Sequence, residues 1–222
     1  KERIVPTLSL AIMTEILTLP ISIPLGVLAA WKANTWIDRG ILIFSTLGFS
    51  IPIFFLGFLL IKAFALELPW FPAAGYVPPE EHFGNFLHRI ILPSLCTAIL
   101  FWAFLVRMTR ATMIEVLRED YIRTARAKGL AEGGVLITHA LKNAALPIAT
   151  VVGWGIAELF AGIVVTEQVF AIPGMGRLIV DSIVRRDYPV IQGCMLTIAV
   201  LQVIVNLLTD MSYALFDPRI KY

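Results

Sequence analysis

Four side chains that could bind a metal ion lie close together in the sequence: Glu80, Glu81, His82 and His88. Imidazole suits nickel among the divalent metals, so a nickel-handling site is the chemistry to consider first. The spacing of these residues, however, matches none of the recurring metal-binding motifs. We therefore expect a solvated loop here, and the sequence assigns no metal site.

Two acidic residues, Glu15 and Glu158, interrupt long apolar stretches of the chain. A carboxylate inside a membrane is costly, which makes such residues candidates for functional sites. They could line a solute pathway and meet the charged ends of a peptide. The alternative is that each one hydrogen-bonds to a neighbouring helix or stays neutral and buried. Both residues are therefore candidate pathway residues.

No other side-chain arrangement in the sequence is typical of an enzyme. A Ser/His/Asp set, a paired-carboxylate site and a CxxC motif in a soluble active site are all missing. The formal net charge of +2 comes without a basic stripe interleaved with aromatic residues, except in one loop. The sequence thus predicts neither intrinsic catalysis nor nucleic-acid binding.

The composition instead points to a membrane protein. The 222 residues are 58% hydrophobic and 15% charged, against roughly 45–50% and 25% in soluble domains. Five apolar segments are long enough to cross about 30 Å of hydrocarbon as helices. They cover residues 7–31, 40–66, 90–106, 144–166 and 190–216. We predict an all-α, polytopic membrane helical bundle, surrounded by membrane lipid, that forms a single transmembrane domain over 1–222.

The distribution of basic residues predicts which connections share a side of the membrane. Eleven of the 18 Lys and Arg residues fall in connections on one side, which is therefore predicted to be cytoplasmic. That side holds the long connection 107–143 and the C-terminus, and the other side holds the outer loops 67–89 and 167–189. The N-terminus then lies outside with an odd number of spans, so we expect one further helix upstream.

The second outer loop contains an amphipathic run after an Ile-Pro-Gly-Met-Gly turn. Its apolar residues recur at helical spacing: Leu178, Ile179, Ile183 and Val184. This pattern predicts a short interfacial or re-entrant helix.

The inner connection 107–143 is much longer than a turn requires. From Glu119 to Lys128 its pattern is helical, and Gly129 supplies a stop at the C-terminal end. Acidic residues in the first turn and basic residues in the last turn complement the helix dipole. We predict a short surface helix, which is either a solvated connector or a rigid element that inserts into a partner's cleft.

The stretches "EDYIRTARAKGL" and "HALKNAALP" resemble the signature loop of binding-protein-dependent ABC importer permeases, in the dipeptide, oligopeptide and nickel branch. In the general family this loop reads Glu-Ala-Ala, three residues, Gly, and later Leu-Pro. Those positions fall here on Arg123, Thr124, Ala125, Gly129, Leu146 and Pro147. The Glu and the first Ala are replaced and the later spacing is longer, as is usual in the peptide branch. The resemblance continues through "EQVFAIPGMGRLIVDSIVRRDYPVIQG" to "DPRIKY" and so covers nearly the whole chain.

The resemblance implies the type I permease fold of ABC importers, with a coupling helix at 119–130 that docks into a groove on an ATPase. The implied coupling residues are Glu119, Asp120, Tyr121, Arg123, Thr124, Ala125, Arg126, Ala127, Lys128, Gly129 and Leu130. We expect Ala125 to face the partner, so that a charge there would uncouple transport without unfolding the helices.

The implied function is that of a permease subunit that moves peptides across a prokaryotic inner membrane by alternating access. No Gly-x-x-x-x-Gly-Lys-Ser/Thr motif occurs, so ATP and Mg²⁺ are expected on a separate ATPase and no cofactor on this chain. The implied partners are a second homologous permease, two ATPase subunits and an external substrate-binding protein.

Three alternatives stay open at this point. The same fold could import nickel or another small solute. A non-transporting membrane scaffold would use the inner helix only as a connector. An ion-coupled transporter would place paired acids at the membrane midplane and would need no ATPase.

Overall fold

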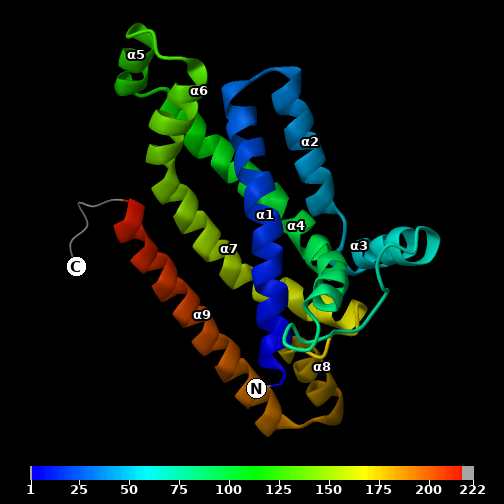
Figure 1. The fold of residues 1–222 in the computed structure, drawn as a ribbon. Coiled ribbons are helices and arrows are strands. Elements are labelled where there is room, and N and C mark those ends of the chain that lie inside the picture. The colour runs from blue at the N-terminus through cyan, green and yellow to red at the C-terminus, as the bar shows by residue number, and fades with distance from the viewer. Residues whose placement is uncertain (1, 217–222) are drawn as a thin grey trace.

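The structure is a computed structural model that describes residues 2–216, except for the side chains of Ala157, Asp210 and residues 212–216. Over this range it contains helices and connections and no strand, which confirms the all-α prediction (Figure 1). The elements are α1 (Ile4–Trp31), α2 (Trp36–Ser50), α3 (Ile53–Leu60), the π-helical η1 (Ile61–Glu67), α4 (Phe83–Leu117), α5 (Asp120–Ala127), α6 (Glu132–Gly134), the π-helical η2 (Val135–Leu141), α7 (Lys142–Val169), α8 (Met175–Arg185) and α9 (Tyr188–Phe216).

The predicted membrane spans appear as four helical spans and one broken pair. Four helical stretches in the described part of the chain are long and apolar enough to cross a membrane: Ile4–Trp31, Phe83–Leu117, Glu132–Ile156 and Tyr188–Thr209. The helices Trp36–Ser50 and Ile53–Glu67 pass the same test together and make a fifth span if they are counted as one.

The second predicted span, 40–66, is not one continuous helix. Its two halves, α2 and α3–η1, are bent by 99° at the break. Pro52 has no N–H to donate to the preceding turn, and Ile51 before it is extended, with ψ of 126°. A residue that precedes proline is disfavoured in the helical conformation. Figure 1 accordingly shows α3 turned away from the direction of α2.

The helices α1 and α4 pack closely along much of their length. Buried small residues recur at every fourth position of α1, namely Thr14, Thr18, Ser22 and Gly26. A Cβ atom added to Gly26 would lie 2.5 Å from the Cβ of Thr109 on α4. Small side chains at a membrane helix interface let the two backbones approach one another, and this interface uses that device.

The connections gather at two ends of the bundle, as Figure 1 shows. The α5 end carries the turn between α1 and α2 together with α5 and α6. The α8 end carries α8 and the start of α1. This grouping agrees with the basic-residue pattern, which put the 32–39 and 107–143 connections on one side. The predicted short helix in the 167–189 loop is also confirmed, as α8.

Candidate functional site

The predicted surface helix is present as α5, and both of its ends are those expected. Glu119 is extended and precedes the first helical residue, Asp120, and the helix ends at Ala127. Gly129 follows with φ of +78°, a conformation that glycine adopts readily. Its N–H donates to the carbonyl of Arg126 over 2.9 Å. The helix and its glycine stop are therefore confirmed.

The face of α5 that turns toward the bundle carries Ile122 and Ala125. Ile122 is fully buried and Ala125 is 7% exposed. Both belong to a hydrophobic cluster with Met113 of α4 and Val135 of η2. The expectation that Ala125 faces a partner is therefore wrong, because this small side chain lies where α5 packs against its own bundle. Helical spacing put Ala125 on one face with other residues but could not tell which face turns inward.

The other predicted coupling residues are accessible from solvent. They are Glu119, Asp120, Tyr121, Arg123, Thr124, Arg126, Ala127, Lys128, Gly129 and Leu130. Partial burial and the nearby Glu119 carboxylate raise the pKa of the Tyr121 hydroxyl. This hydroxyl therefore stays protonated at neutral pH and can donate a hydrogen bond. The structure presents these residues on one helix and the turn that follows it.

Sequence patterns do not indicate two residues of this region, Glu132 and Ile137. The Arg126 Nε donates to Glu132 Oε1 over 2.8 Å, which ties α5 to α6 across the Gly129 turn. Ile137 is an apolar side chain that is 66% exposed, and it belongs to η2, which contacts α5. Glu132 lies six positions from Arg126 and beyond a helix break, so helical spacing carried no signal for this pair.

A bidentate ion pair joins α2 to α4 near the α5 end. Arg110 Nε and Nη2 donate to the two carboxylate oxygens of Asp38 over 2.6 and 2.7 Å. The Asp38 side chain is only 3% exposed. It also accepts a hydrogen bond from the backbone N–H of Asn34, over 2.8 Å. The pair therefore fixes the first turn of α2 against α4 and against the turn that precedes α2.

A second buried carboxylate, Glu167, organises the α8 end. The Thr7 hydroxyl of α1 donates to Glu167 Oε1 over 2.6 Å and accepts from the Met175 N–H over 2.8 Å. The other oxygen, Oε2, accepts from the Arg177 N–H over 2.9 Å. Glu167 thus satisfies free N–H groups at the start of α8 and links α1, α7 and α8. Glu167 begins the connection predicted at 167–189, and no pattern in the sequence indicates this role.

The histidines of the outer loop have local structural contacts. His82 Nδ1 accepts from the Asn85 N–H at the start of α4, over 3.4 Å. His88 Nε2 lies 2.7 Å from the Trp70 carbonyl oxygen. Among the described residues no group of three or more His, Cys, Asp or Glu is arranged to hold a metal ion.

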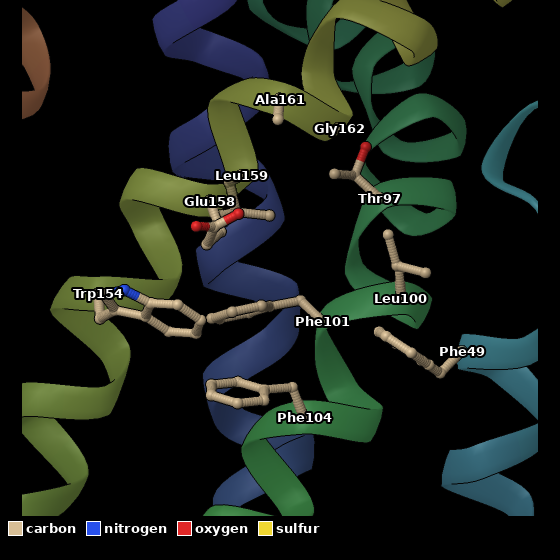
Figure 2. Close-up of a pocket in the computed structure, with 10 residues that line it drawn as sticks. All are labelled: Phe49, Thr97, Leu100, Phe101, Phe104, Trp154, Glu158, Leu159, Ala161 and Gly162. Atoms are coloured by element: carbon tan, nitrogen blue, oxygen red, sulfur yellow. The ribbon is translucent and has the colours of Figure 1, made fainter. Parts of the chain in front are cut away.

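The two candidate pathway acids lie in different cavities. Glu15 borders a groove of about 620 Å³ between α1, α7 and α9. Its two carboxylate oxygens have no hydrogen-bond partner in the described part of the chain. Glu158 borders a separate pocket of about 370 Å³ between α2, α4 and α7, which Figure 2 shows. The structure therefore does not pair these acids, as the ion-coupled alternative would require.

Known proteins with similar sequences and a similar fold are permeases and a chain of an ABC transporter. The chain is 46% identical to the oligopeptide transport system permease protein AppB of Bacillus subtilis, over 99% of the chain and 70% of AppB. It is 40% identical to the dipeptide transport system permease protein DppB of Alkalihalophilus pseudofirmus, over 97% of the chain and 71% of that protein. A chain of the MetNI methionine ABC transporter, in an inward-facing crystal structure, superimposes with a TM-score of 0.77 at 16% identity. The alignment covers 96% of the present chain and 93% of the MetNI chain.

The predicted fold is therefore confirmed as the helical fold of an ABC importer permease. The family described as "Binding-protein-dependent transport system inner membrane component" matches residues 22–222. Membership implies an ATPase and a binding protein as partners, and it makes this chain a transport component that is not itself catalytic. The helical architecture and the family match agree, and the chain belongs to the binding-protein-dependent inner membrane components of ABC transporters.

Proposed function

We propose that this chain is the permease subunit of an ATP-driven importer that moves peptides across the inner membrane of a prokaryote. Similarity to AppB and DppB, permeases of oligopeptide and dipeptide systems, extends over nearly the whole chain and supports peptides as the cargo. The two bundles of a permease pair would rock between inward-open and outward-open states during transport.

The observation that carries the proposal is that α5 packs against the bundle with one face and exposes the other. Ile122 and Ala125 anchor the helix to α4 and η2, while Tyr121, Thr124 and Lys128 remain exposed. A helix that is fixed on one face and polar on the other suits docking into a groove on a separate ATPase subunit. That ATPase would carry ATP and Mg²⁺ and would drive α5 as a rigid body.

The proposed complex contains this chain, a second homologous permease, two ATPase subunits and an external substrate-binding protein. The α5 end would face the cytoplasm, together with the C-terminus, because it collects the larger share of basic residues. The solute pathway would run along the face that the second permease covers. The candidate pathway acids are Glu158 and Glu15, each of which lines a cavity.

Reconstitution of the complete transporter in proteoliposomes tests the proposal. Lys128→Glu reverses a charge on the exposed side of α5 and should lower ATP-dependent peptide uptake at least tenfold at unchanged thermal stability. Glu81→Lys, which reverses an exposed charge in the connection before α4, is the matched control and should transport normally. Normal uptake by the Lys128 variant would overturn the docking assignment, and a wild-type complex that moves no peptide with ATP would overturn the function itself.

A further inference from the structure

The pocket beside Glu158 differs in its lining from the groove beside Glu15. Its walls come from α2, α4 and α7, and four of the ten lining residues are aromatic: Phe49, Phe101, Phe104 and Trp154. Its volume of about 370 Å³ lies at the lower end of the range for small-molecule sites. By contrast, the groove beside Glu15 is lined chiefly by aliphatic side chains.

Glu158 is the one acidic residue among the side chains that line this pocket, and no basic residue lines it. The residue is exposed, and no ion pair or hydrogen bond to its carboxylate occurs within the described residues. The hydroxyl of Thr97 is already engaged, since it lies 3.2 Å from the Pro93 carbonyl and 3.1 Å from the Thr166 hydroxyl. The pocket therefore offers one carboxylate that has no ion-pair partner among the described residues, in a largely apolar wall, and this arrangement can receive a cation. The nearby Arg107 guanidinium lies over the Phe49 ring, 5.7 Å from its centroid.

The aromatic rings strengthen this preference. The Phe104 and Trp154 rings lie 5.3 Å apart, and the Phe101 ring lies 6.1 Å from Phe104. Figure 2 shows the Glu158 carboxylate on the same side of the pocket as the Trp154 and Phe101 rings. A cation that pairs with the carboxylate can also contact the faces of these rings, which attract positive charge. Trp154 is 56% exposed and so is open to a ligand in the single chain.

We propose that this pocket receives the ammonium end of a peptide during its passage, with Glu158 as the counter-ion and Trp154 as the aromatic contact. This inference rests on the proposed function, because it takes a peptide as the solute. A peptide offers one primary ammonium group and an adjacent side chain, which match one carboxylate and an apolar wall. A divalent metal would need further oxygen or nitrogen ligands, and the lining residues do not supply them.

The test measures binding in the pocket without the external binding protein, which could itself select for the amino terminus. Ala161 is an exposed lining residue, so Ala161→Cys places a thiol in the pocket. The natural cysteines, Cys96 and Cys194, are both buried, and the wild-type complex gives the background labelling. Maleimide labelling of the full transporter in nanodiscs is then followed with millimolar peptide or with the same peptide acetylated at its amino terminus.

The free peptide should slow labelling of the Ala161→Cys complex several-fold, and the acetylated peptide should not. Adding Glu158→Gln should abolish this protection, whereas Glu81→Gln, which removes an exposed outer-loop charge, should leave it intact. Equal protection by both peptides, or protection that survives Glu158→Gln, would overturn the proposal. In proteoliposomes Glu158→Gln should also lower uptake of the free peptide about tenfold.

Different experimental outcomes would overturn the proposed function and the proposed role of the pocket. If the Glu158→Gln variant took up peptide at the same rate as the wild type, the proposed role of the pocket would be overturned, and the proposed function as a peptide importer would remain. If Glu158→Gln instead prevented the second permease from co-purifying, the carboxylate would pair with a cation of that subunit, and the ammonium proposal would be overturned. Absence of ATP-dependent uptake in the wild type would count against the function rather than the pocket.

Discussion

Asp38 and Arg110, which are 72 positions apart, form two parallel hydrogen bonds of 2.6 and 2.7 Å between α2 and α4. The Asp38 side chain is almost fully buried, while the Arg110 side chain is 22% exposed. Removing one partner of a buried ion pair leaves the other charge uncompensated in a poorly hydrated site. The pair therefore fixes the position of α2 on α4 more than a surface ion pair would.

Arg110→Ala should lower the free energy of unfolding by about 3 kcal/mol, because Asp38 would then be buried without its counter-ion. Thermal unfolding of the detergent-solubilised protein measures the change. The double variant Asp38→Leu with Arg110→Met removes both charges and should recover most of the lost stability. A single variant that melts like the wild type would show that water replaces the guanidinium at no cost.

Ala125→Glu should destabilise the packing of α5, because it forces a carboxylate into the cluster with Ile122, Met113 and Val135. We expect faster proteolysis and faster amide exchange across α5. Ala127→Glu makes the same change on the exposed side of the same helix, and it should destabilise α5 much less, by only the small cost of a carboxylate in the last turn. Equal behaviour of the two variants would contradict the inward orientation of Ala125.

Gly129→Ala should loosen the C-terminal end of α5 by about 1 kcal/mol, because residue 129 has φ of +78° and alanine adopts that conformation poorly. The space around this glycine is open, so no clash contributes to the effect. Gly133→Ala is the control, since it also enters open space but lies in a helix, where alanine is favoured. Hydrogen exchange of the α5 amides distinguishes the two.

Gly174→Ala should disturb the α8 end, because a Cβ at this position would overlap the Glu167 carboxylate. Overpacking of this kind costs about 1–3 kcal/mol, and the buried Glu167 has little room to move. Gly193→Ala on α9 meets nothing within 4 Å and should be neutral or slightly stabilising. Thermal unfolding and amide exchange of α8 compare the Gly174→Ala and Gly193→Ala variants. Equal protection of the α8 amides in the two variants would contradict a tight contact between Gly174 and Glu167.

Local signals explain which parts of the fold could be predicted. The ends of α5 follow from acidic residues, basic residues and Gly129, all within ten positions of one another. The amphipathic run that became α8 is equally local. The break at Pro52 was visible as a proline inside an apolar run, but the angle of 99° depends on what α3 packs against.

The remaining features depend on contacts between distant parts of the chain. Glu167 and Thr7 are 160 positions apart, and no single-sequence pattern links them. Likewise, the orientation of Ala125 is set by Met113 and Val135, which lie outside the helix. The separation of Glu15 and Glu158 into two cavities also had no sequence signal, because both residues simply interrupt apolar helices.

The cluster that anchors α5 also determines which helices a displacement of α5 would move. Ile122 and Ala125 are packed against the end of α4 and against η2, which runs directly into α7. A displacement of α5 would therefore act on both α4 and α7. These same two helices form opposite walls of the pocket beside Glu158. Unequal movement of these two helices would change the width of that pocket.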